Sequence, residues 1–166
     1  MPAGKQVDLK NATVTFTDAA GTPNTLDINI AEGTLTVNVS DPVEFTLDRG
    51  KVATGTVRKA DEVPVEFEIA SIFQSYTASS GDTETPLEFI ERRGPAAAYV
   101  STGASCDPYC IDITITLDNS ACSTATEDEV YTLPKCYFET KNFDFGAGTF
   151  TLSGRCKSAT MSSARS

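Results

Sequence analysis

Apolar and polar residues alternate along most of this chain, and this period of two is the feature that most constrains its fold. Ile111, Ile113 and Ile115 alternate with Asp112 and Thr114 in the clearest example. Such a pattern is typical of a β-strand with one buried face and one solvated face. The sequence predicts strands over residues 13–17, 26–30, 35–39, 43–47, 63–69, 111–117, 133–140 and 148–154.

One segment departs from the alternation and has the signals of a short helix. Thr85 can cap it, Pro86 suits the first helical position, and Glu88 completes a capping box. Gly94 suits the position just after the helix. The fold class that follows is mainly antiparallel β, as a sandwich or small barrel with one short helix. We expect one domain over residues 1–157 and a loose polar C-terminal tail over residues 158–166.

The absence of histidine and the acidic charge exclude several classes of function. The chain has 166 residues, 13 Lys and Arg, 23 Asp and Glu, no His and no Trp, and a net charge of −10. A catalytic pair that needs His cannot be built from this chain alone, and neither can a His-ligated zinc or haem site. Tight binding to a phosphate backbone needs clustered Lys and Arg. We therefore expect no enzyme activity, no cofactor and no metal.

The region from residue 34 to residue 69 is long for one hairpin, and it has a turn near residues 48–51. Its arms are rich in β-branched residues, so it is a candidate for strands that project beyond a small sandwich. Acidic side chains give it an acidic outward face: Glu44, Asp48, Asp61, Glu62, Glu66 and Glu68. Basic side chains offset part of this charge: Arg49, Lys51, Arg58 and Lys59. An ordinary solvated strand face would have the same pattern.

The order of these segments resembles the tail tube (major tail) proteins of tailed bacteriophages. The resemblance spans residues 8–157 and rests on the spacing of seven stretches. They are EGTLTV (32–37), DRGK (48–51), RKADEVPVEF (58–67), TPLEFI (85–90), IDITITLD (111–118), YTLPKCYF (131–138) and GTFTLSG (148–154). It implies a two-sheet β-fold with a flanking helix, and a long hairpin from each subunit that lines a lumen.

The resemblance also implies a function without catalysis. Subunits would form hexameric rings, stacked into a hollow tube that conducts the genome during ejection. The chain would lie in the virion tail after assembly in the host cytoplasm. Its partners would be itself, a sheath, baseplate and tail terminator proteins. The sequence leaves open whether the tail is contractile, although a minimal subunit leans slightly to the contractile type.

An acidic lumen would repel DNA phosphates, whereas basic luminal residues would retard the DNA. We therefore expect Glu44, Glu66 and Glu68 to face the lumen. The basic residues of the hairpin region should then face neighbouring subunits: Arg49, Lys51, Arg58 and Lys59.

Five cysteines leave three interpretations open: Cys106, Cys110, Cys122, Cys136 and Cys156. Zinc needs four thiolates, usually as two close pairs, and only Cys106 and Cys110 are close. Buried thiols would suit Cys136 and Cys156, which lie on predicted strands. Disulfides, within or between subunits, would form after release into an oxidising medium. A link from Cys122 to Cys106 or Cys110 would be local, and a Cys136–Cys156 link could bridge neighbouring strands. The connectivity does not follow from the sequence.

Other functions compete with the tube subunit. A β-sandwich binding or adhesion module would use polar loops, and Tyr76, Tyr99 and Tyr109 lie in loop-like stretches. Another tail or baseplate component of related fold would have the same strand pattern. Calcium binding through Asp107, Asp118, Asp128 and Glu129 lacks a spaced acidic loop. The N-terminal residues form no apolar signal region and no stretch is long enough to span a membrane, so we expect neither secretion nor insertion.

Overall fold

The computed structural model describes residues 12–30, 33–73, 76–78, 84–118 and 128–165. Its main sheet is antiparallel, with the strand order β3-β6-β10-β9-β8-β1-β2-β7, and β11 pairs with β9. The strands are β1 (Ala12–Thr17), β2 (Thr25–Asn29), β3 (Thr34–Asn38), β6 (Glu66–Ile72), β7 (Tyr76–Ala78), β8 (Ile111–Leu117), β9 (Glu129–Asp144), β10 (Thr149–Cys156) and β11 (Ser162–Arg165). A second sheet consists of β4 (Val43–Asp48) and β5 (Lys51–Lys59). The expected class, mainly antiparallel β in a sandwich with one short helix, is confirmed, and within the described residues the sheets do not close into a barrel.

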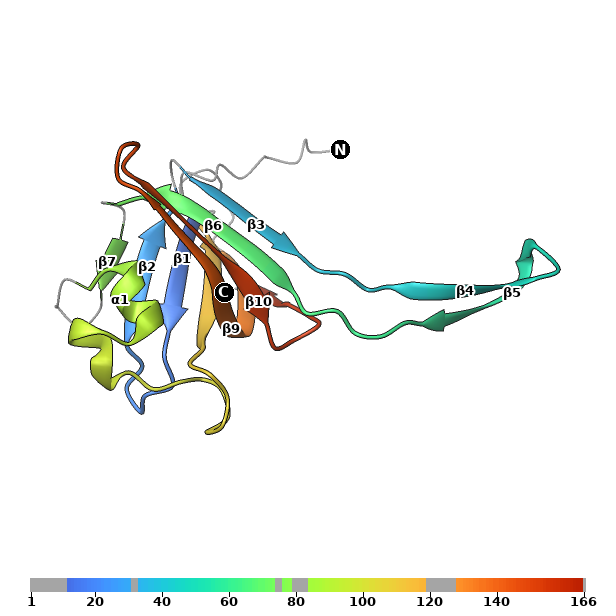
Figure 1. Ribbon diagram of the computed structural model, residues 1–166, viewed down its shortest axis with the longest axis horizontal. Coiled ribbons are helices and arrows are strands. Elements are labelled where there is room, and N and C mark those ends of the chain that lie inside the picture. The colour runs from blue at the N-terminus through green and yellow to red at the C-terminus, as the bar shows by residue number, and fades with distance from the viewer. Residues whose placement is uncertain (1–11, 31–32, 74–75, 79–83, 119–127, 166) are drawn as a thin grey trace.

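Strand β9 connects the two layers of the sandwich. Its first half pairs with β8 and its second half pairs with β10. Between them lies a β-bulge in which Lys135 has φ +52°. The Lys135 N–H donates to Asp112 Oδ1 at 2.9 Å, and not to a carbonyl oxygen of the neighbouring strand. Bulges bend a strand and increase its twist. In Figure 1, β6, β9 and β10 accordingly cross β1 and β2 at an angle.

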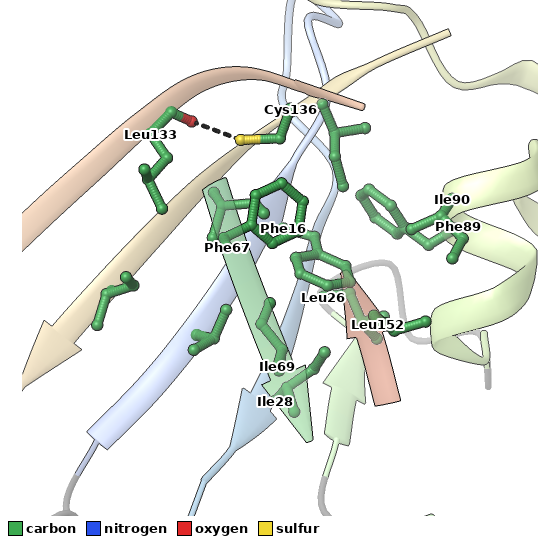
Figure 2. Packing of buried hydrophobic residues seen from close by; sticks show 14 of the residues in the cluster. Phe16, Leu26, Ile28, Phe67, Ile69, Phe89, Ile90, Leu133, Cys136 and Leu152 are labelled. Carbon is green, nitrogen blue, oxygen red and sulfur yellow. Dashed lines mark hydrogen bonds between the residues drawn. The ribbon is translucent and has the colours of Figure 1, made fainter. Parts of the chain in front are cut away.

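The core lies between these layers and is rich in aromatic rings. Phe138 on β9 makes edge contacts with Phe16 on β1 and with Phe67 on β6, at centroid distances of 5.4 and 5.2 Å. Phe89 from the helix meets Phe16 at 6.0 Å (Figure 2). Burial of each such side chain contributes about 1.5–3 kcal/mol relative to exposure. The apolar residues on the inward faces of these strands therefore form the buried core that the alternation predicts.

The predicted helix is α1 (Pro86–Glu91), and its start has the expected capping box. Thr85 Oγ1 accepts from the Glu88 N–H at 3.3 Å, and Glu88 Oε2 accepts from the Thr85 N–H at 2.9 Å. Its end differs from the prediction, because Arg92 already takes the left-handed conformation at φ +52°. A 3₁₀ helix, η2 (Gly94–Ala98), follows directly.

Strands β4 and β5 form a two-stranded ribbon that projects far from the sandwich (Figure 1). They are joined by Arg49 and Gly50, with φ of +50° and +76°, in the predicted turn. Two positive φ values are typical of the tight hairpin turn that matches strand twist. The ribbon, which we call the β4–β5 ribbon, is joined to β3 through residues 39–42 and to β6 through residues 60–65.

The C-terminal residues form a strand where we expected a loose tail. Ser162–Arg165 is strand β11, paired with residues 129–132 of β9 in antiparallel register. Its side chains are exposed, and backbone pairing with β9 together with an ion pair between Arg165 and Glu129, at 3.5 Å, holds it in place. Among the described residues, no helix is long and apolar enough to cross a membrane.

Candidate assembly interface

The β4–β5 ribbon has an apolar face that nothing in this chain covers. Val43, Phe45 and Leu47 lie on one side of β4, and Val57 of β5 is opposite Phe45. All four side chains are at least half exposed. The alternation over residues 43–47 predicts a strand with one buried face, and this part of the prediction is wrong, because every residue of β4 is exposed. The ribbon extends beyond the core, so its apolar side has no partner layer within this subunit.

The opposite face of the ribbon is polar. Glu44 lies opposite Arg58, and Thr46 lies opposite Thr56. The Arg58 Nε donates to Glu44 Oε2 at 2.5 Å, in an ion pair whose side chains are 75% and 51% exposed. A pair so exposed contributes little to stability, since water screens it. Its partners share one face, so whatever surface meets Glu44 also meets Arg58.

The other basic residues predicted for subunit contacts lie at the two ends of the ribbon. Arg49 is in the turn, and Lys51 follows it opposite Asp48. Lys59 lies at the root, where its Nζ is 3.4 Å from Asp41 Oδ1. All of these side chains are exposed.

Glu66 and Glu68 lie away from the ribbon, on the solvent face of β6. They line a shallow hollow of about 390 Å³ together with Thr36, Asn38, Glu139 and Arg155, and we call this the acidic hollow. Glu66 is the direct cross-strand neighbour of Arg155. The Arg155 Nε also donates to both carboxylate oxygens of Glu139, at 3.0 and 3.1 Å. That hydrogen bonding lowers the pKa of Glu139 below its usual range.

The acidic hollow thus holds three carboxylates and one guanidinium. Arg155 forms an ion pair with Glu139, so the surface around Glu66 and Glu68 keeps an excess of negative charge. This combination was not predicted, because it depends on β6, β9 and β10 lying side by side. The structure brings Glu66 and Glu68 together but leaves Glu44 on the separate β4–β5 ribbon.

The cysteines fall into different environments. Cys136 and Cys156 are buried and face each other on β9 and β10, whereas Cys106 is exposed and Cys110 is buried beside Ser101 and Thr102. Cys122 lies outside the described residues. No disulfide joins the four cysteines that the structure describes.

The acidic residues considered for calcium are dispersed. Asp107 accepts from Lys157 Nζ at 2.7 Å and from the Tyr137 hydroxyl at 3.3 Å. Glu129 accepts from the Tyr131 hydroxyl at 3.1 Å. Within the described part of the chain, no three His, Cys, Asp or Glu side chains form a group that could hold a metal ion.

Tyr76, expected in a loop, lies on strand β7, and the other two tyrosines of the adhesion-module interpretation, Tyr99 and Tyr109, do not form an exposed aromatic surface. Tyr99 is buried, where its ring meets Phe89 at 5.0 Å and its hydroxyl donates to Glu84. Tyr109 is half-buried, and the Arg92 guanidinium covers its ring at 5.3 Å from the ring centroid. Burial raises the pKa of Tyr109 above its usual range.

Comparison of the whole fold finds two similar solved structures. One is a chain of an extracellular contractile injection system described as the PVC sheath/tube terminator in the extended state. It has a TM-score of 0.59 and 11% sequence identity, over 97% of this chain and 98% of that chain. The other is from the PVC sheath-tube complex in the extended state, with a TM-score of 0.57 and 11% identity over 96% and 93% of the two chains. No family model and no curated protein matches the sequence.

These similarities show a shared fold that covers nearly the full length of each chain. These two chains of a contractile injection system therefore have a fold similar to that of this chain, which agrees with the fold that the resemblance to tail tube proteins implies. At 11% identity the likeness describes the fold alone. The function must be argued from the surfaces described above.

Proposed function

We propose that this chain is a structural subunit of a tail tube, in which hexameric rings stack around an acidic bore. The observation that carries the proposal is the β4–β5 ribbon, whose apolar face is exposed on a fold shared with chains of a contractile injection system. The ribbon gives each subunit an arm that reaches beyond its own core. A second copy of the chain is the occupant that we assign to this arm.

The exposure of the ribbon's apolar face to water favours a partner subunit that covers it. A two-stranded hairpin is at best marginally stable alone in water, and contiguous exposed apolar patches mark interaction sites. Phe45 and its apolar neighbours have no core of their own to join. Packing against another subunit removes this surface from water, at roughly 25 cal/mol for each Å² buried.

Charge favours a second copy over an unrelated partner. Residues 41–59 include four basic and three acidic side chains, whereas the rest of the chain has nine basic and twenty acidic ones. The ribbon is thus the basic part of an acidic protein. Arg49 and Lys51 at its tip would meet an acidic surface on a neighbouring subunit, which supports the predicted role of the basic residues. Such complementarity also orients subunits during encounter.

The acidic hollow supports the assignment of a bore. Glu66 and Glu68 lie on the open polar face of β6, next to Glu139 on β9. A bore with excess carboxylates would repel phosphates, so that DNA slides without sticking. Glu44 has a weaker part in this role, because Arg58 offsets its charge.

A tail tube would have further protein partners. A sheath would surround it, and baseplate and terminator proteins would close its ends, with the assembled tail in a virion. No catalytic step is part of this function.

Photo-crosslinking tests the proposal. A benzophenone amino acid replaces Phe45 on the apolar face of the ribbon, and Thr46 on the polar face in a matched control. Illumination should give crosslinks between two copies from position 45, and more efficiently than from position 46. Equal yields at both positions, or crosslinks only within one chain, would contradict the assigned occupant.

A further inference from the structure

Cys136 and Cys156 form a close pair of thiols in the core of the sandwich. They are direct cross-strand neighbours on β9 and β10, and their Sγ atoms are 2.9 Å apart. Their residues are 0% and 1% exposed. Cys136 Sγ also donates to the Leu133 carbonyl oxygen at 3.3 Å (Figure 2). Both side chains therefore occupy fixed, adjacent positions.

The backbone around this pair has the geometry that a cross-strand disulfide needs. The Cys156 N–H donates to the Val65 carbonyl, on the side away from β9, whereas the next N–H, of Lys157, donates to Lys135 on β9. Cys136 and Cys156 are thus a non-hydrogen-bonded pair of the ladder. Cα atoms in such pairs are about 4.5 Å apart, with their side chains at their closest. That separation is within the range of roughly 4.4–6.8 Å found across disulfides.

We propose that Cys136 and Cys156 are a redox site, which closes to an intrasubunit disulfide when the chain folds in the presence of a small-molecule disulfide. Of the other described cysteines, Cys106 is exposed, and Cys110 Sγ contacts the hydroxyls of Ser101 and Thr102. The inference does not depend on the proposed function.

The reaction is a pair of thiol–disulfide exchanges with an oxidant such as glutathione disulfide. One cysteine loses its proton and its sulfur attacks the oxidant, which forms a mixed disulfide and releases one glutathione thiolate. The second cysteine loses its proton and attacks the sulfur of the first cysteine in this mixed disulfide. This closes the Cys136–Cys156 bond and releases the second glutathione thiolate. Two protons move to the two glutathione products, and the two protein thiols supply the two electrons.

Burial determines when this reaction can occur. Hydrogen bonding with Cys156 and burial raise the pKa of the Cys136 thiol, and the thiolate is the attacking species. The finished core also excludes the oxidant. We therefore expect oxidation during folding, after β9 and β10 have paired and before the core closes around the two thiols.

The bond would strengthen the root of the projecting ribbon. The Cys156 N–H donates to the Val65 carbonyl oxygen, and the Val65 N–H donates to the Ser158 carbonyl oxygen, both at 2.9 Å. Val65 is where the chain re-enters the sandwich from the ribbon, just before β6. A disulfide that fixes Cys156 to β9 would therefore also restrain the strand segment that anchors the ribbon.

Refolding and mass spectrometry test the site. The full chain is unfolded and reduced, then refolded in a glutathione redox buffer, denatured and alkylated with N-ethylmaleimide. The wild type should carry three adducts on its five cysteines, and trypsin should release residues 136–141 linked to residues 156–157. Five adducts, or a linkage that involves Cys106, Cys110 or Cys122 instead, would overturn the proposal.

Single substitutions give matched controls. Cys136→Ser and Cys156→Ser should each retain four alkylated thiols, whereas Cys106→Ser should retain two and still contain the 136–156 linkage. Hydrogen exchange tests the effect on the ribbon root. The Val65 and Cys156 amides should exchange at least tenfold more slowly in the oxidised wild type than in the reduced one. Equal exchange rates would overturn the restraint on the root.

Discussion

Phe45 and Val57 lie opposite each other across the β4–β5 ribbon, and each is 58% exposed. Large apolar side chains on a projecting arm have no core of their own subunit to pack against. They are the residues that an assembly interface would bury. This pair therefore links the fold to the proposed function, and the first prediction follows from it.

Phe45→Glu should weaken self-association at least tenfold, because a desolvated aromatic anchor in an interface contributes about 2 kcal/mol or more. The free energy of unfolding of the monomer should change by no more than about 0.5 kcal/mol, since the site is exposed. Sedimentation equilibrium and urea unfolding measure the two quantities. Thr46→Glu places the same charge on the polar face and should have the smaller effect on association. An equal loss in both variants would argue against an apolar contact.

Asp18→Asn should destabilise the fold by about 1.5–3 kcal/mol at pH 7, the range for hydrogen bonds to a charged group. The buried Asp18 carboxylate accepts from Asn24 N and Nδ2 and from Val100 N, at 2.7, 3.0 and 3.1 Å. It thereby joins the β1–β2 turn to the segment after η2. Asp61→Asn, at an exposed position, is the control and should be neutral.

The same carboxylate gives a pH dependence. Burial alone would raise the pKa of Asp18, but hydrogen bonds from Asn24, Val100 and Ala20 together hold it below the ordinary 3.8. A lowered pKa in the folded state stabilises the fold above pH 3.8, and this stabilisation is lost as the pH falls through the folded pKa. The difference in unfolding free energy between wild type and Asp18→Asn should therefore shrink below pH 3.8. A difference that stays constant down to pH 2 would contradict this assignment.

Thr85→Ala should cost about 1 kcal/mol, the usual effect of removing an N-cap side chain. The variant loses the hydroxyl that accepts from the Glu88 N–H. Thr85→Ser keeps this oxygen and should retain most of the stability in thermal unfolding. If serine and alanine cost the same, the capping box would not be what stabilises the start of α1.

Gly154→Ala should destabilise by about 1–3 kcal/mol, the usual cost of forcing extra atoms into a packed core. A Cβ at this position would lie 1.9 Å from the Tyr137 carbonyl oxygen, at the β-bulge between β9 and β10. Gly21→Ala is the control, because a Cβ there meets nothing within 4 Å. Urea unfolding of both variants measures the difference. Equal stability would mean that β9 and β10 separate at little cost.

Much of the fold is predictable from the sequence because burial and alternation coincide in the sandwich. Strand β8 has the bounds expected from its alternating isoleucines, and the capping box of α1 is present. Strand β5 is expected only as the second arm of the projecting hairpin, without bounds of its own, because Val52 and Val57 are an odd number of residues apart and the register shifts between them. Strand β11 has no apolar residue of alternating spacing, so only its pairing with β9 reveals it.

The candidate interface was less predictable, since it depends on what surrounds each strand. Alternation identifies Val43, Phe45 and Leu47 as one face, but it does not distinguish a face buried in the subunit from one that projects into solvent. The ion pair of Glu44 with Arg58 depends on the hairpin register. The proximity of Cys136 to Cys156 depends on the pairing of β9 with β10, which the spacing of the cysteines does not specify.

The most direct test of the tube assignment is electron cryomicroscopy of the purified protein at high concentration. The account predicts stacked rings with six-fold symmetry, with Phe45 buried against a neighbouring subunit and with Glu66 and Glu68 on the bore. Particles that remain monomeric, or rings in which the β4–β5 ribbons project freely into solvent, would contradict it.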